Sequence, residues 1–168
     1  METKDFNQYD VVVVGGGFAG FGAAMGAAQQ EVKTLLIEAT GVLGGLAVNG
    51  LVNPFMKFDY EGEQLIEGAF GELVNRLEEE MAYYGRAFNY EAVKYNLADM
   101  LEEAGVDILL YHQITGLETD VNKIDKIIAH AFGRRLEIQG KVYIDCTGDA
   151  VLAKLANHTV FSGDKEHG

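Results

Sequence analysis

The chain has 168 residues, 48% of them hydrophobic, so it is long and apolar enough to fold around a core of its own. Its 26 Asp and Glu outnumber its 13 Lys and Arg, and the resulting net charge of −13 opposes binding to the phosphates of nucleic acids. That charge does not oppose a phosphate-containing cofactor, which local backbone N–H groups and helix ends can hold.

The single cysteine, Cys146, excludes an internal disulfide and any C-x-x-C pair. The first ten residues are polar, and no stretch of about 18 apolar residues occurs, so we expect neither a secretory signal nor a membrane span. These features predict a cytoplasmic protein without a membrane or nucleic-acid partner.

The chain opens with the pattern of a βαβ unit. The β-branched run from Tyr9 to Val14 predicts a buried strand of a parallel sheet. Small residues from Ala19 to Gln30 predict a helix, and residues 33–38 predict a second strand. Residues 40–63 carry glycines and little periodicity, which indicates an irregular segment facing a ligand.

Two amphipathic helices are expected next. Apolar residues recur at helical spacing from Leu65 to Met81, and again from Ala92 to Ala104. Asn89 is the expected N-cap of the second helix, and Gly105 is expected to end it.

Alternating strands dominate the remainder. Residues 106–111 predict a third central strand, and residues 142–145 predict a return to the parallel sheet. Between them, three alternating segments predict an antiparallel β-meander where a doubly wound fold usually has a helix: residues 114–118, 126–132 and 136–138. Turn residues separate these segments: Asp120, Asn122 and Gly133. Asp149 is expected to cap a last helix that runs to about Asn157.

These elements predict an α/β fold of the Rossmann-like, dinucleotide-binding type. We expect a central parallel sheet with helices on both faces and a β-meander crossover, forming one domain over residues 1–160. Residues 161–168 are then a C-terminal tail.

The strongest motif is the run Gly15-Gly16-Gly17-Phe18-Ala19-Gly20, which satisfies G-x-G-x-x-G between a predicted strand and a predicted helix. Gly15 allows a tight turn, Gly17 lets a pyrophosphate approach the backbone, and Gly20 lets the helix approach the strand. The helix N-terminus then offers N–H groups and a partial positive charge to the phosphates.

Glu38, about 20 residues further on at a strand end, is the expected acceptor for the ribose hydroxyls of an adenosine. A carboxylate there disfavours NADP, whose 2′-phosphate it would repel.

Two further segments suggest contact with the same ligand. Gly41-Val42-Leu43-Gly44-Gly45-Leu46-Ala47 provides a second close approach of the backbone, which a protein holding only NAD rarely needs. The segment Asp145-Cys146-Thr147-Gly148-Asp149-Ala150 lies at the carboxyl end of a parallel strand, where ligands of open α/β sheets bind.

With these segments in this order, the chain resembles the FAD-dependent oxidoreductases among the flavoproteins with two dinucleotide-binding domains. The resemblance covers nearly the whole chain and implies FAD bound in extended form. The residues that it implies at the cofactor are Gly15, Gly16, Gly17, Phe18, Ala19, Gly20, Glu38, Ala39, Gly44, Gly45, Leu46, Ala47, Ile114, Thr147, Gly148 and Asp149.

The sequence departs from that family in two respects. Cys146 stands where a small residue is usual, and we interpret it as a packing substitute. The chain also ends at Gly168, before the substrate domain that the resemblance implies, so the chain alone is expected to turn over little or no substrate. The alternative is that a partner chain or a second copy supplies the missing substrate wall. The substrate or electron donor is an unidentified small molecule.

Three alternatives stay open on the sequence. The first is a NAD-binding dehydrogenase module, and the second is a flavin-dependent tRNA-modifying protein, which the acidic balance opposes. The third is a non-catalytic fragment or subunit that only binds nucleotide.

No catalytic residue and no metal site are predicted. The four histidines show no metal spacing: His112, His130, His158 and His167. Residues 83–86 could face a substrate, but the end of an amphipathic helix is the favoured interpretation. Nothing resembles a nucleophile with its base.

Overall fold

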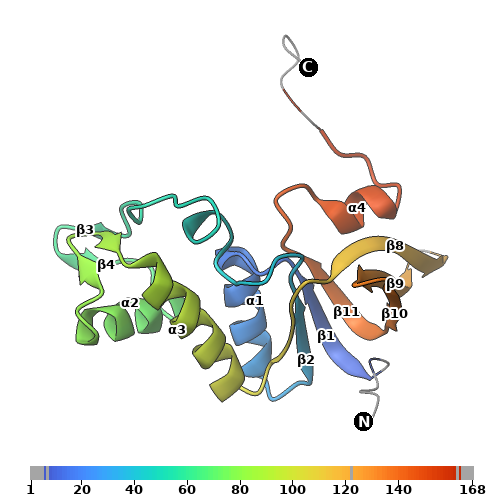
Figure 1. Cartoon of the computed structure of the whole chain (residues 1–168), viewed down its shortest axis with the longest axis horizontal. Coiled ribbons are helices and arrows are strands. Elements are labelled where there is room, and N and C mark those ends of the chain that lie inside the picture. The colour runs from blue at the N-terminus through green and yellow to red at the C-terminus, as the bar shows by residue number, and fades with distance from the viewer. Residues whose placement is uncertain (1–5, 7, 122, 162, 164–168) are drawn as a thin grey trace.

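The structure is a computed structural model that describes residues 6, 8–121, 123–161 and 163. Its centre is a parallel sheet in which the described strands have the order β11-β1-β2-β7 (Figure 1). These strands span β1 (Tyr9–Val14), β2 (Thr34–Ile37), β7 (Asp107–Leu109) and β11 (Gly140–Asp145). The predicted α/β fold with a central parallel sheet is confirmed, but β7 lies at the sheet's edge and was expected to be central.

The two faces of the sheet are covered by different kinds of element (Figure 1). On one face, Val13 and Leu36 pack against the helices α1 (Phe18–Ala28), α2 (Ala69–Glu79) and α3 (Tyr90–Glu103). On the other face, Val12 and Leu35 pack against the meander and α4 (Val151–Leu155). Helices were expected on both faces, yet the meander replaces most of them on the second face.

The meander itself is confirmed. Its strands β8 (Gln113–Asp120), β9 (Lys123–Ala131) and β10 (Arg134–Ile138) form an antiparallel sheet in the order β10-β9-β8. They are longer than the alternating segments, because β8 pairs with β9 as far as Asp120 and Lys123, and β9 pairs with β10 as far as Ala131 and Arg134. Asn122, one of the predicted turn residues, lies outside the described residues.

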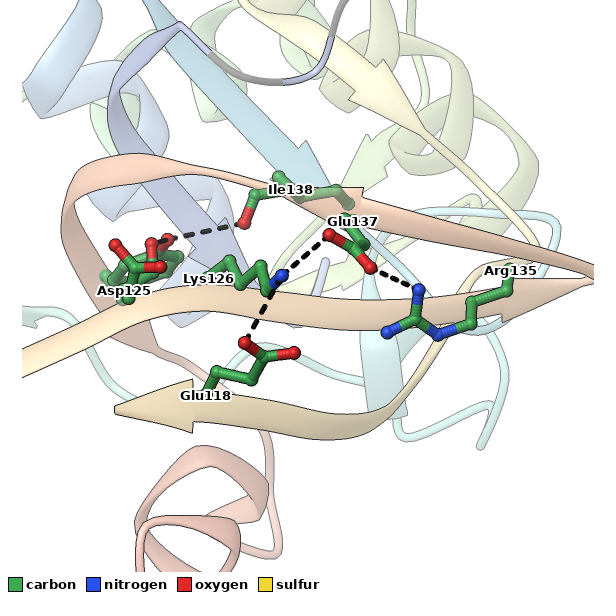
Figure 2. A network of polar contacts seen from close by, with 7 residues as sticks. Glu118, Asp125, Lys126, Arg135, Glu137 and Ile138 are labelled. Atoms are coloured by element: carbon green, nitrogen blue, oxygen red, sulfur yellow. Dashed lines mark hydrogen bonds and ion pairs between the residues drawn. The ribbon is translucent and has the colours of Figure 1, made fainter. Parts of the chain in front are cut away.

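A cluster of charged side chains lies across these three strands (Figure 2). Lys126 on β9 contacts Glu118 on β8 at 3.2 Å and Glu137 on β10 at 2.8 Å, and Arg135 also pairs with Glu137. Hydrogen bonds from Lys126 and then Arg135 lower the pKa of the Glu137 carboxyl from 4.5 to about 2.

The predicted helix over residues 65–81 is shorter in the structure. Leu65 and Ile66 are exposed and precede the helix, because Gly68 adopts a φ of +66° and separates them from Ala69. The preceding segment contains a short hairpin of β3 (Asp59–Tyr60) and β4 (Glu63–Gln64).

Residues 83–86 are not a helix end, as was favoured, but part of a hairpin of β5 (Tyr83–Tyr84) and β6 (Ala87–Phe88). The next helix begins as predicted: the side-chain oxygen of Asn89 accepts hydrogen bonds from the N–H groups of Glu91 and Ala92. Gly105, with a φ of +77°, follows its end.

The start of α4 corrects a sequence prediction. Asp149 was expected to be the N-cap, but the N-cap position is Ala150 and Asp149 is exposed. The cap comes from the strand: one carboxylate oxygen of Asp145 accepts hydrogen bonds from the N–H groups of Leu152 at 2.8 Å and Ala153 at 3.2 Å. Asp145 reaches across the turn because β11 and α4 pack side by side.

Candidate functional site

Two glycines at the junction of β1 and α1, Gly15 and Gly20, have no room for a side chain. Gly15 has a φ of +101°, and a Cβ atom there would lie 2.7 Å from the carbonyl oxygen of Cys146. A Cβ atom on Gly20 would lie 1.8 Å from the carbonyl oxygen of Gly15. The roles predicted for these two glycines, a tight turn and a close helix-to-strand approach, agree with this geometry.

Gly17 differs from both, because the space around it is open. A Cβ atom at Gly17 would have the Cα of Gly45 as its nearest neighbour, at 3.8 Å. Gly17 is the N-cap of α1 and has no side chain to satisfy the N–H groups of the first turn. Phe21 is the first residue of the helix whose N–H bonds back to Gly17, so the earlier N–H groups have no intrahelical acceptor. This arrangement suits an anionic ligand.

A second glycine loop lies directly against the first. The N–H of Gly44 donates to the carbonyl oxygen of Gly16 at 2.8 Å. Gly45 opens the 3-10 turn η1 (Gly45–Ala47), and a Cβ atom on it would lie 3.0 Å from the Cα of Gly17. The two backbones therefore meet without side chains between them, and the segment from Gly41 to Ala47 lies beside the first loop.

Glu38 joins the two loops through its carboxylate. One oxygen accepts from the N–H of Gly16 at 2.7 Å, and the other accepts from the N–H of Thr40 at 2.7 Å. An ionised carboxylate has about four acceptor sites, so sites remain for ribose hydroxyls. The sequence predicts the ribose contact, and the structure adds a second role for Glu38 in holding the Gly16 turn.

A cavity of about 600 Å³ opens above these loops, within the range of natural cofactor sites. Its walls include these residues predicted at the cofactor: Gly15, Gly17, Phe18, Ala19, Glu38, Ala39, Gly44, Gly45, Leu46, Ala47, Ile114, Thr147 and Gly148. The structure thus brings together five separate segments of the chain.

Three of the predicted residues do not line the cavity. Gly16 is buried beneath the side chains of Leu43 and Glu38, and Gly20 is buried against Gly15. Asp149 lies on the exposed side of the turn after β11.

Thr147 faces the cavity with its hydroxyl already engaged. Its Oγ1 donates to Asp145 at 2.6 Å and accepts from the N–H of Val151 at 2.8 Å. The N–H of Thr147 also donates to Asp145, at 3.1 Å. This turn therefore offers a ligand mainly the open surface of Gly148, where a Cβ atom would meet nothing within 4 Å.

Sequence reasoning did not assign these wall residues to the cofactor: Val14, Ile37, His112, Gln113, Cys146 and Val151. Of these, Cys146 does stand in a segment expected to contact the ligand. The Nδ1 of His112 lies 2.6 Å from the carbonyl oxygen of Leu110, which can only accept, so Nδ1 carries the proton and Nε2 is an acceptor in the neutral ring. Burial, and then the Asp145 charge, raise the pKa of the Cys146 thiol, which agrees with the interpretation of this residue as a packing element.

The described residues contain no group of three or more His, Cys, Asp or Glu placed to hold a metal ion. His167 lies outside the described residues. No described helix has the length and apolar character needed to cross a bilayer. Nothing in the geometry singles out a catalytic side chain.

The fold and this cavity define a dinucleotide-binding protein of the Rossmann type, with its ligand at the carboxyl ends of parallel strands. Residues 10–168 match the family of FAD dependent oxidoreductases. The chain belongs to that family, and its cofactor is FAD.

Curated relatives are similar over short segments. Dihydrolipoyl dehydrogenase of Trypanosoma brucei brucei is 57% identical over 44 residues, 26% of this chain and 9% of that protein. Mitochondrial glycerol-3-phosphate dehydrogenase of Bos taurus is 32% identical over 88 residues, 46% of this chain and 12% of that protein. The matched part thus spans about a tenth of each relative.

Solved structures are similar over most of the chain. L-proline dehydrogenase from P. horikoshii has a TM-score of 0.65 at 14% identity, covering 90% of this chain and 56% of that one, which concerns the fold alone. Thioredoxin reductase of Lactococcus lactis has a TM-score of 0.52 at 28% identity, covering 84% and 36%.

These likenesses support FAD over two of the alternatives left open by the sequence, a NAD-only module and a tRNA-modifying flavoprotein. The residues also fit the cofactor on their own geometry. Side chains larger than hydrogen at Gly17 and Gly45 would fill the space between the loops, where a pyrophosphate needs access to the backbone.

Proposed function

We propose that this chain is the cofactor-holding part of an enzyme that transfers electrons or hydride between FAD and a small organic molecule. The observation that carries the proposal is the contact of two bare glycine loops at the open N-terminus of α1, inside a cavity of about 600 Å³. Gly15, Gly17 and the first turn of α1 would hold the pyrophosphate, Glu38 the adenosine ribose, and backbone near Ile114 the adenine.

The redox chemistry is supplied by the flavin when it is bound. The protein's own residues bind, orient and shield it. Gly44 to Ala47 and Thr147 with Gly148 extend the cavity walls beyond the pyrophosphate loop, with backbone rather than charged side chains. The Thr147 hydroxyl lies beside the Asp145 carboxylate, but it is held in the turn before α4, where it also accepts from the N–H of Val151. We therefore assign to this chain positioning rather than covalent catalysis.

We propose further that a partner chain or a second copy completes the substrate side. Leu46 lines the cavity and is 75% exposed, and the nearby Leu51 and Val52 are also exposed. An apolar rim of this kind is suited to being covered by another protein surface. Accordingly, the chain alone should show little substrate turnover with FAD bound. Substrate-selective turnover at protein concentrations where the chain is monomeric would contradict this part.

The decisive experiment identifies the cofactor. The purified chain is scanned for the visible absorbance of a flavin, and the cofactor is released by heat and compared with FAD, FMN, NAD and NADP standards. We expect FAD. FMN, NAD or NADP as the sole nucleotide would overturn the proposed function, and NAD alone would favour the dehydrogenase-module alternative.

We also propose a cytoplasmic location, since the sequence has a single cysteine and thus lacks the paired cysteines of disulfide-rich secreted domains. Fractionation of the producing cells tests this: recovery of the protein with the membranes or outside the cell would contradict it.

A further inference from the structure

A second cavity lies beside the cofactor cavity and shares a wall residue with it. Its volume is about 320 Å³, at the lower end of the range for sites that bind small molecules. Its walls come from α1, from the segment between η1 and α2, and from the start of α2: Phe18, Phe21, Gly22, Phe55, Met56, Lys57, Phe58, Ile66 and Phe70. Phe18, the first residue of α1, also lines the cofactor cavity, so the two cavities adjoin there.

Aromatic rings form most of the wall of this second cavity. The rings of Phe18, Phe55 and Phe70 contact one another edge to face, with centroids 5.6, 6.3 and 5.2 Å apart. Phe58 contacts Phe70 in the same way, at 5.0 Å. Aromatic pairs favour this arrangement, so a wall of such rings suits a further aromatic ring as its ligand.

The segment that carries Phe55 is held in place by the hairpin of β5 and β6. The N–H of Phe55 donates to the carbonyl oxygen of Arg86 at 3.0 Å. The side chain of Asn53 donates to the carbonyl oxygen of Phe88 at 2.6 Å and accepts from the N–H of Phe88 at 3.3 Å. The wall is therefore fixed before any ligand arrives, as the walls of small-molecule sites usually are.

Of the described wall residues, Lys57 is the one that carries a charge. Its ammonium lies 5.4 Å from the ring centroid of Tyr60, and no described carboxylate is paired with it. The acid nearest in sequence, Asp59, is instead bound to Arg86 at 3.1 Å. In a chain with a net charge of −13, a cation without an acidic partner beside an apolar cavity favours a ligand with an anionic group.

We propose that this second cavity binds the aromatic ring of a small carboxylic acid, with the carboxylate at Lys57, and that it is this chain's share of the substrate site. The inference rests on the proposed function, since a substrate role requires FAD in the adjoining cavity. The volume agrees with such a ligand, because an apolar cavity of roughly 150 Å³ is enough to hold a benzene molecule.

The probe is 3-phenylpropanoate, and two analogues separate the two features of the proposal. The analogue 3-cyclohexylpropanoate keeps the acid and lacks the aromatic ring, whereas 3-phenylpropanamide keeps the ring and lacks the charge. Each compound is titrated calorimetrically into the FAD-loaded and the cofactor-free protein. We expect the cyclohexyl analogue to bind about fivefold more weakly than the probe, and the amide about threefold more weakly.

Two substitutions test the wall itself. Gly22→Leu fills the cavity without a backbone clash, because a Cβ atom at Gly22 meets nothing within 4 Å and a helical side chain there leans back over Phe18. Gly22→Ala is the matched control, since it also replaces a helical glycine but leaves the cavity open. Lys57→Gln removes the charge alone.

We expect Gly22→Leu to bind the probe at least about tenfold more weakly than the parent, and Gly22→Ala to bind it within about twofold. Lys57→Gln should bind the acid and the amide equally. Neither glycine variant should melt below the parent, because both remove a glycine from a helix. In the FAD-loaded parent the probe should also change the visible absorbance of the flavin, because Phe18 borders both cavities.

Three results would overturn the inference: parental probe affinity in Gly22→Leu, equal affinities of the parent for the probe and both analogues, or probe binding without any effect on the flavin. Self-association of the parent that is lost in Gly22→Leu, without probe binding, would also overturn it and assign the cavity to a second copy. If the parent binds no FAD, the proposed function fails and the substrate role with it, whereas probe binding by the same protein still decides whether the cavity is a site.

Discussion

Two strand-to-helix turns of this molecule lie at the same edge of the parallel sheet and have opposite chemistry. After β1, the helix α1 begins at Gly17, with no side chain to cap its N–H groups. After β11, Asp145 and Thr147 accept the N–H groups at the start of α4. Both turns connect a parallel strand to a helix. The N–H groups of the first turn of α1 are open to an anion, whereas those of α4 are bonded to side chains of the protein, because only the second turn has acceptor side chains beside the helix end.

The largest effect is expected where the first turn is tightest. Gly20→Ala would place a Cβ atom 1.8 Å from the carbonyl oxygen of Gly15, and backbone cannot yield as a side chain can. We expect a loss of about 3 kcal/mol or more in the free energy of unfolding, measured by urea denaturation. Gly26→Ala on the same helix, with nothing within 4 Å, should instead gain about 0.5–1 kcal/mol. Equal effects of the two would contradict the packing role of Gly20.

Next in size is the effect of filling the open turn. Gly17→Val puts a branched side chain where the pyrophosphate must approach, at a φ of −72° that valine accepts. We expect FAD affinity to fall about a hundredfold, equivalent to about 2.7 kcal/mol, whereas the cofactor-free protein loses only about 1 kcal/mol. Titration with FAD and melting without it separate the two; unchanged FAD affinity would show that the loop has been wrongly assigned.

A smaller effect is expected at the satisfied turn. Asp145→Ala removes the acceptor of the N–H groups of Leu152 and Ala153, and should cost about 2 kcal/mol of stability. The control is Asp149→Ala, which should change stability by less than about 0.5 kcal/mol because Asp149 is exposed and is not the cap. A larger loss of unfolding free energy in Asp149→Ala than in Asp145→Ala, measured by urea denaturation, would show that Asp149 is the cap.

The smallest effect concerns the charged cluster on the meander, far from either turn. Because the folded-state pKa of Glu137 is about 2, below its ordinary 4.5, its ion pairs contribute stability above pH 4.5 and lose it as the pH falls toward 2. The stability difference between the parent and Glu137→Gln should therefore shrink over that range, and FAD affinity at neutral pH should not change. A constant difference across the range would contradict the lowered pKa.

The glycine motif was the most predictable part of the site, because only glycine tolerates the backbone conformation and the close contacts that these positions require. A side chain at Gly15 or Gly20 would clash with backbone atoms, and Asn89 caps α3 through its own side chain. Asp145 could not be recognised as the cap of α4, since its partners lie seven and eight residues away and depend on how β11 and α4 pack. The place of His112 in the cavity wall could not be predicted either, because it depends on the hydrogen bond from its N–H to the carbonyl oxygen of Glu38, far away in the sequence.

The helix expected over residues 65–81 was predicted to begin too early, because its sequence pattern was followed too far. Leu65 and Ile66 satisfy the helical spacing by coincidence, and Gly68 interrupts it. Periodicity reports which side chains could share a face, whereas the glycine's positive φ determines where the helix can begin.

The contact between Gly17 and Gly45 links cofactor supply to the lifetime of the protein. These residues come from separate segments that meet only when β1, α1 and β2 are assembled, so FAD should recognise the folded chain and not the unfolded one. By mass action, FAD at a thousand times its dissociation constant would add about 4 kcal/mol to stability. A cell short of flavin would then hold the same chain in a more readily unfolded and degraded state, so that vitamin status, rather than gene expression alone, would set its abundance.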